Sequence, residues 1–212
     1  MTPLNNLQFM PSALIKLIES FRLLPGIGPK TAQKLAFSTL KMSTQQVNEI
    51  SESLLDIKIQ LIFCESCQNI SENQHCNICI DDKRDSSIIC VVEEFMDVYV
   101  LEKSGAFKGK FHVLHGSISP VNGIGPDEIR IKELVSRVKN TPEIEEIVIA
   151  TNLNLEGEAT AMYINQLLSN TKTKLKITRL ARGLPSGSDI EYADETTILH
   201  ALGSRVNINE SI

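Results

Sequence analysis

The sequence predicts an α/β protein built in several parts, and three observations support that fold class. The first sixty residues show the apolar spacing of helices. Four cysteines then fall between positions 64 and 79. After them, short β-branched runs alternate with amphipathic stretches, which is typical of βαβ units with a mostly parallel sheet. We therefore expect an N-terminal helical hairpin region, a small four-cysteine finger, a mostly parallel sheet with flanking helices, and a C-terminal arm.

The N-terminal region predicts three helices. Apolar residues recur three to four positions apart over residues 14–21, 32–40 and 47–57, so each segment predicts a helix with one buried face. Ser43, with Gln46 three residues later, predicts a capping box at the start of the third helix. The faces expected to be buried on the second and third helices consist of Ala32, Leu35, Ala36 and Leu40, and of Val47, Ile50, Leu54 and Ile57.

The second half of the chain predicts alternating strands and helices. The strands are expected at residues 87–93, 111–114, 147–150 and 175–178, and the helices at residues 97–103, 127–139 and 157–168. A short apolar segment at 197–202 follows in the tail. Strands that alternate with helices in this way favour parallel pairing with crossover helices.

Composition excludes several classes of protein. The chain has 212 residues, of which 42% are hydrophobic and 22% charged, so wholesale disorder is excluded. No apolar run approaches the roughly 18 residues that a membrane span needs, and no secretory signal is visible at the N-terminus. We therefore expect a cytoplasmic protein with no membrane partner. A net charge of −5 excludes a uniformly basic surface, so any nucleic-acid site must be a local patch.

The cysteine spacing indicates a metal centre. The pattern is Cys64-x2-Cys67-x8-Cys76-x2-Cys79. Four thiolates match the tetrahedral preference of Zn²⁺ and leave no position for a catalytic water, so we expect one structural Zn²⁺ per chain. The alternatives are a redox pair or reduced core cysteines. His75 is a competing ligand beside the third cysteine, and Cys90, which lies in an apolar run, is expected to be a buried core thiol.

A glycine-rich turn joins the first two helices. Gly26 and Gly28 permit close backbone approach, and the helix that follows presents free N–H groups at its start. Lys30 and Lys34 lie one turn apart on that helix, in a segment (residues 11–41) that carries five basic residues and one acid. The turn is interpreted as a grip on phosphate backbone. The alternative is an ordinary helix–helix turn with solvated lysines.

Acidic residues follow two of the predicted strands. Glu93 and Asp97 follow the first strand, and Glu156 and Glu158 follow the third. Because the carboxyl ends of parallel strands share one edge of a sheet, these four acids are candidates to converge there. Such a cluster either binds Mg²⁺ or forms a docking surface for a basic partner. Acids at helix N-termini with no ligand are the alternative.

The chain resembles the RecR family of bacterial recombination mediators over essentially its whole length. The resemblance is carried by LPGIGPK at 24–30 with AQKLAF at 32–37, the four-cysteine spacing, ICVVEE at 89–94, HVLHG at 112–116, SPVNGIGP at 119–126, ATNLNLEGEATA at 150–161 and ITRLARGLPSGSDIEYAD at 177–194. The order and spacing of these segments make the match specific.

The resemblance implies a layout and a function. Residues 1–57 correspond to a helix-hairpin-helix DNA-binding region, 58–84 to a zinc finger, 85–180 to a Toprim domain and 181–212 to a C-terminal arm. The family forms a homotetrameric ring that encircles DNA, with lysines at the positions of Lys30 and Lys34 facing the hole. Its members act with RecO and RecF to load the RecA recombinase at single-stranded gaps. The Toprim acids then serve partner binding rather than catalysis.

One departure from catalytic Toprim enzymes supports a role without catalysis. Those enzymes pair a Glu with an Asp-x-Asp on a later strand, where this chain has Asn152-Leu153-Asn154. Two amides in place of two carboxylates weaken a Mg²⁺ site. Asn154 and Leu155 also stand where many family members have Thr-Val. The alternatives are a Mg²⁺-dependent Toprim nuclease or primase-like enzyme that uses Glu93, Glu156 and Glu158, and a zinc-ribbon interaction module with no role in nucleic-acid binding.

Overall fold

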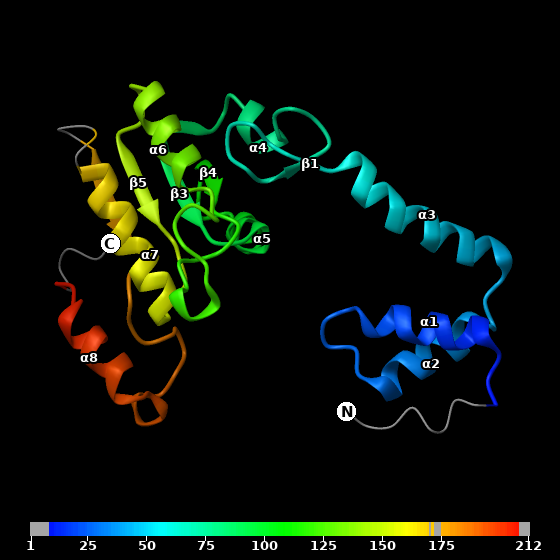
Figure 1. The fold of residues 1–212 in the computed structure, drawn as a ribbon. Coiled ribbons are helices and arrows are strands. Elements are labelled where there is room, and N and C mark those ends of the chain that lie inside the picture. Colours follow the sequence, from blue (N-terminus) through cyan, green and yellow to red (C-terminus); the bar gives the residue numbers. More distant parts are fainter. Residues whose placement is uncertain (1–8, 170, 172–174, 208–212) are drawn as a thin grey trace. The chain divides into compact units, whose positions relative to one another are not determined.

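The computed structural model describes residues 9–169, 171 and 175–207 of the chain (Figure 1). The chain divides into two compact units, Met1–Leu61 and Ile62–Ile212. The prediction that no secretory signal is present concerns residues 1–10, of which 1–8 lie outside the described residues. Among the described helices, none has the length and apolar character needed to cross a bilayer.

The N-terminal unit contains the helices α1 (Ser12–Arg22), α2 (Pro29–Thr39) and α3 (Thr44–Gln60). A small core joins α1 to α2, and its buried members are Leu14, Ile18, Ala32 and Ala36. Alanine on the α2 side lets the two helices approach closely, because its side chain is a single methyl group. The three predicted helices are confirmed. The predicted capping box on α3 is also present, with Ser43 and Gln46 each accepting from the other's backbone N–H.

The buried face predicted for α3 is wrong. No residue of α3 is buried, and Ile50, Leu54 and Ile57 are 49%, 63% and 56% exposed. On α2 the same error affects Leu35 and Leu40, which are exposed. The spacing of apolar residues predicts an apolar stripe along one side of a helix. It does not tell whether that stripe is covered by the same chain or by another surface.

The second unit begins with the cysteine loop. Two short strands, β1 (Ile62–Phe63) and β2 (Ile70–Ser71), pair antiparallel, and α4 (Asn77–Ile80) follows them. The four-stranded sheet then consists of β3 (Asp85–Val92), β4 (Gly109–Val113), β5 (Glu146–Ile149) and β6 (Lys176–Arg179). All its pairs are parallel and the strand order is β4-β3-β5-β6, which confirms the predicted α/β class.

Helices cover both faces of this sheet (Figure 1). They are α5 (Phe95–Ser104), α6 (Ile131–Asn140) and α7 (Leu155–Ser169). Ile89 and Val91 of β3 pack in a core with α6 and α7, whereas Cys90 and Val92 pack on the opposite side with α5. Burial on both faces explains the continuous apolar run in β3. It also confirms Cys90 as a core thiol, and burial raises the pKa of that thiol to about 12.

The C-terminal segment ends in the helix α8 (Glu195–Gly203), preceded by a 3₁₀ turn at Ile190–Tyr192. Asp194 caps α8 by accepting from the backbone N–H of Thr197. No side chain of α8 is buried, and Leu199 and Leu202 are 69% and 63% exposed. Like α3, this helix presents apolar side chains to solvent in the single chain.

Candidate functional site

The four cysteines of the finger form one compact cluster. The sulfur atoms of Cys64, Cys67, Cys76 and Cys79 all lie within 4.8 Å of one another, and three of the four residues are buried. Tetrahedral Zn–S bonds of about 2.3 Å place sulfurs about 3.8 Å apart. The donor set therefore fits a metal ion of this kind. Among the described residues, this is the one group of three or more His, Cys, Asp or Glu side chains close enough to hold an ion.

Backbone turns hold each cysteine pair in place. The amide of Gln68 donates to the carbonyl of Cys64, and the amide of Cys79 donates to that of Cys76. The amide of Cys76 also donates to the sulfur of Cys64 at 3.3 Å, as expected for a thiolate ligand. His75 instead contacts Ser66 through Nδ1 at 3.2 Å and lies outside the cysteine cluster.

Contacts between the sulfurs shift the pKa values of the cysteine thiols in opposite directions. Hydrogen bonds with Cys67 and Cys79 lower the pKa of the Cys76 thiol, whereas the bond to Cys76 raises the pKa of Cys67. The first thiolate is thus stabilised by its neighbours, and further thiolates are opposed by burial and like charge. A bound cation removes this opposition, which is the chemistry of a metal–thiolate centre.

Strand β4 ties the cysteine loop to the sheet. The amide of Val113 donates to the carbonyl of Cys67 at 2.8 Å, and Nε2 of His115 contacts the carbonyl of Gln68 at 2.6 Å. The His115 ring also lies 4.3 Å from the ring of Phe63, between centroids. These contacts join the first cysteine turn to the end of an edge strand, so the loop and the sheet support each other.

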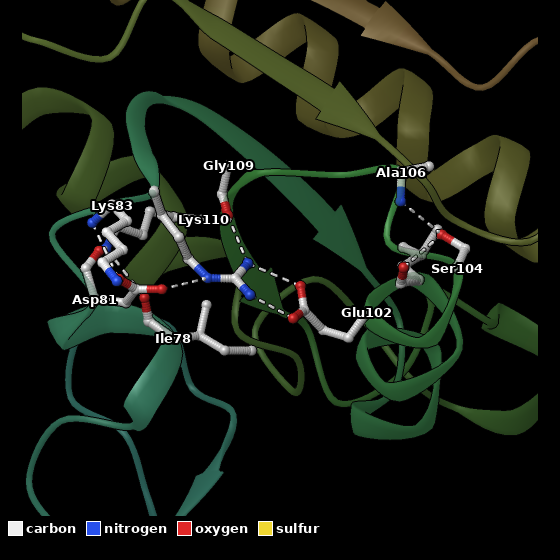
Figure 2. A network of polar contacts seen from close by, with 10 residues as sticks. Ile78, Asp81, Lys83, Glu102, Ser104, Ala106, Gly109 and Lys110 are labelled. Atoms are coloured by element: carbon white, nitrogen blue, oxygen red, sulfur yellow. Dashed lines mark hydrogen bonds and ion pairs between the residues drawn. The ribbon is translucent and has the colours of Figure 1, made fainter.

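Lys110 joins β4 to the second cysteine turn. Its ammonium group donates to the carbonyls of Ile78, Cys79 and Asp81 at 3.0, 3.1 and 2.7 Å (Figure 2). The residue is only 7% exposed. Because a buried ammonium group needs partners, its three bonds to the last turn of α4 fix that turn in place. Sequence reasoning missed Lys110, although a lysine directly before a predicted apolar strand is the signal that could have found it.

Arg84 holds the start of the same edge strand, next to Lys110. Its guanidinium group pairs with Glu102 through two nitrogens and donates to the carbonyl of Gly109 at 3.2 Å (Figure 2). Arg137 in turn donates to the carbonyl of Phe111 at 2.6 Å. Side chains and the cysteine loop thus occupy three backbone groups of β4, at Gly109, Phe111 and Val113, which hinders pairing of this edge with another strand.

The glycine-rich turn lies between α1 and α2, as predicted. Gly26 has a φ of +80°, a conformation that other residues rarely adopt, and Gly28 is the N-cap of α2. Lys30 and Lys34 are exposed on α2. No acidic residue lies between Glu19 and Glu49, so the charge of this face is uniformly positive.

The four acids predicted at the sheet edge have different surroundings. Glu93 is 6% exposed, and both its oxygens are held by Asn152, from the backbone N–H at 2.8 Å and from the side-chain amide at 2.7 Å. A side chain at Gly157 would lie 2.1 Å from the carbonyl oxygen of Asn152, so only glycine fits there. Asp97 accepts from the N–H of Glu94 and caps α5.

The two acids of α7 differ from each other. Glu158 pairs with Arg179 at 2.5 Å and also with Arg182, so its charge is compensated. Glu156 is half-buried, and its carboxylate makes no hydrogen bond or ion pair with another residue in the described part of the chain. Sequence reasoning missed the roles of the two arginines. The signal that could have found them is their position in the segment ITRLARG, directly after the predicted last strand at 175–178. The structure therefore brings Glu93 and α7 together through Asn152, but the four carboxylates do not form one metal-binding group among the described residues.

Comparison with known proteins agrees with this arrangement. Residues 14–58 match the RecR helix-hairpin-helix family, residues 87–181 the Toprim domain, and residues 183–206 the RecR C-terminal family. Similar curated proteins include Recombination protein RecR of Staphylococcus aureus strains Newman and COL. Each is 51% identical over 198 residues, which covers 93% of this chain and 98% of the relative.

Proposed function

Because the chain belongs to the RecR family of recombination proteins, we propose that it acts in recombinational repair as a DNA-binding clamp and adaptor. In this proposal it works with RecO and RecF to help load the RecA recombinase at single-stranded gaps, in the cytoplasm. The observation that carries the DNA-binding role is the exposed, acid-free lysine face of α2 next to the glycine-rich turn. Lys30 and Lys34 hold phosphates there, and Gly26 and Gly28 let the backbone approach the strand.

Self-association supports the clamp part of the proposal. The exposed apolar side chains of α3 and α8 are of the kind that a second copy covers in an obligate oligomer. A homotetrameric ring presents four copies of the α2 face to one DNA molecule. Weak phosphate contacts from each copy then add, because later contacts form at high effective concentration.

Structural zinc is the metal we propose for the cysteine cluster, at one ion per chain. Thiolate donors and a filled tetrahedral set favour Zn²⁺ over oxygen-preferring ions. With no open position, the ion supplies folding energy to residues 58–84 rather than chemistry. The domain limits proposed for the remainder are 1–57, 85–180 and 181–212.

The acidic sheet edge is proposed to bind partners rather than to catalyse. In the described structure the side-chain amide of Asn152 donates to Glu93, and the side-chain oxygen Oδ1 of Asn154 accepts from the backbone N–H of Gly157. Both amides that replace the Asp-x-Asp carboxylates thus have structural roles. Glu156 offers its carboxylate to a basic surface of RecO or RecF. Of the other three acids, Glu93 holds Asn152, Asp97 caps α5, and Glu158 pairs with Arg179 and Arg182.

Two measurements test this proposal. Lys30→Ala with Lys34→Ala is expected to lose retention of gapped DNA, whereas the matched control Lys103→Ala with Lys139→Ala, which removes two exposed lysines elsewhere, retains it. Unchanged retention in the first variant would remove the DNA-binding role of α2.

The Mg²⁺-dependent nuclease is tested on labelled DNA: cleavage that increases with protein concentration and is lost in Glu93→Ala would replace the adaptor by an enzyme.

Partner binding needs its own test. Glu156→Lys is expected to weaken retention of RecO or RecF in a pull-down without changing DNA binding. Full retention of both partners by this variant would remove the acidic edge from the proposal.

A further inference from the structure

An exposed aromatic ring lies among the lysines of α2. Phe37 is 45% exposed, and it lines a shallow groove together with Lys30, Lys34 and Lys41. The groove is completed by two polar side chains, Gln33 and Ser38. A large apolar side chain on the charged face of an amphipathic helix breaks the usual separation of polar and apolar residues.

Helical geometry places Phe37 on the lysine side of α2 rather than on the core side. At about 100° per residue, Phe37 lies about 20° from Lys30 and about 60° from Lys34 around the helix axis. The buried Ala32 and Ala36, which face α1, lie about 140° and 100° from it by the same geometry. The ring therefore lies at the edge of the lysine face, and along the helix axis it stands between Lys34 and Lys41, so a ligand that lies along these lysines passes beside it.

The charge around the ring indicates what covers it. Three lysines surround Phe37, and no acid lies between Glu19 and Glu49. The same face of a second copy would bring like charges together, which opposes self-association there. A polyanion that also offers a flat aromatic surface is complementary to both features, and single-stranded DNA has that chemistry.

We propose that Phe37 is a stacking platform for an unpaired base of single-stranded DNA, with Lys30, Lys34 and Lys41 on the flanking phosphates. This inference rests on the proposed DNA-binding function and adds a preference to it. Bases within a continuous duplex are already stacked and offer no free face, so the ring contributes only where bases are unpaired. The lysines hold either kind of strand, and Phe37 favours gaps and single-stranded ends.

Affinity measurements on two kinds of DNA test the preference. Phe37→Ala is expected to weaken binding to a single-stranded oligonucleotide about tenfold, the loss typical of one base–aromatic stack, and to leave binding to a blunt duplex of the same length unchanged. The dependence on salt should stay the same, because no phosphate contact is lost. Lys30→Ala with Lys34→Ala should weaken both DNAs and lower the salt dependence. Phe9→Ala, which removes an exposed ring outside the described helices, is the matched control.

A fluorescence measurement gives a direct readout of stacking. The chain has no tryptophan, so Phe37→Trp introduces a single reporter. Its emission should be quenched by the single strand and not by the duplex, while Phe9→Trp should respond to neither.

The outcomes separate this inference from the function on which it rests. Equal loss on both DNAs in Phe37→Ala, no loss at all, or no quenching of Phe37→Trp would overturn the stacking role, even if the double lysine variant confirms DNA binding. A change in the DNA-free solution mass of Phe37→Ala would also overturn it, since the ring would then be a contact between copies. If the double lysine variant binds both DNAs normally, the proposed function fails as well.

Discussion

The cysteine finger and helix α3 are neighbours in the chain, yet they differ in how far their side chains are buried within it. The finger buries three of its four cysteines and joins both of its turns to β4 through Cys67, Gln68 and Lys110. Helix α3 buries nothing, and its apolar stripe faces solvent. The first region is held within one chain by polar bonds to the sheet, and it gathers four cysteines that can bind a metal ion. The second region leaves its apolar stripe uncovered within one chain, and we propose that another copy covers it.

Loss of a metal ligand is expected to have the largest effect, and it tests the first half of this comparison. Cys67→Ser should release the metal and unfold the finger, because the free energy of binding the ion is free energy of folding there. We expect a loss of at least about 3 kcal/mol in stability and a zinc content well below one ion per chain. Metal analysis and thermal melting measure the two quantities.

The matched control is Cys90→Ala, which removes a buried thiol outside the cluster. It should keep one ion per chain. A Cys67→Ser variant with unchanged melting, or a wild-type protein that contains iron or no metal after reduced, chelator-free purification, would contradict the assignment.

A charge on α3 tests the second half of the comparison. Leu54 is 63% exposed, so Leu54→Glu should leave the fold of a single chain intact. In a tetramer the same change puts an unpaired charge into an apolar interface, and we expect assembly to weaken at least about a hundredfold. Light scattering should give a mass well below the roughly 94 kDa of four 23.5 kDa chains.

Asn48→Glu adds the same charge to the polar side of α3 and serves as the control. If Leu54→Glu assembles like the wild type, α3 is not covered by another copy and the contrast with the finger loses its explanation.

The same contrast shows how far the sequence could be interpreted. Local patterns placed the cysteine cluster, the four parallel strands and the capped start of α3, because each depends on residues close together in the chain. Burial of the apolar face of α3 was wrongly predicted, because a stripe of apolar residues does not tell which surface covers it. The arginines that neutralise Glu158 and the carbonyls held by Lys110 were missed, because these contacts join segments far apart in sequence.

A substitution at Lys110 tests how firmly the cysteine finger is joined to the sheet. Its expected effect on stability is smaller than that of losing a metal ligand. Lys110→Met keeps the volume of the side chain but leaves three carbonyls without their donor, at a cost of about 2–3 kcal/mol. We expect a lower melting temperature and faster loss of zinc to a chelator, since the last turn of α4 carries Cys79. Lys108→Met, two residues earlier and exposed, should change neither quantity. Equal chelator kinetics in both variants would mean that the finger holds its metal without help from β4.

The smallest expected effect concerns pH, and it comes from the same strand. His112 is fully buried, and Nε2 contacts the carbonyl of Arg130 at 2.8 Å, while Nδ1 is buried with no partner among the described residues. Burial lowers the pKa of His112 from 6.5 to about 3. Below pH 6.5 the His112 imidazole is therefore protonated in the unfolded chain but stays neutral in the folded chain. The free energy of unfolding falls as the pH drops below about 6.5. Between pH 7.5 and 5.5 this single group should cost about 1.4 kcal/mol.

His112→Gln separates this group from the cysteines, which also lose metal in acid. Glutamine can still donate to the Arg130 carbonyl but does not titrate, so the variant should lose about 1.4 kcal/mol less than the wild type between pH 7.5 and 5.5. Denaturant unfolding at both pH values, with zinc content measured at each, gives the comparison. Parallel pH profiles would show that acid acts first on the metal centre, and that the sheet edge contributes no pH dependence of its own.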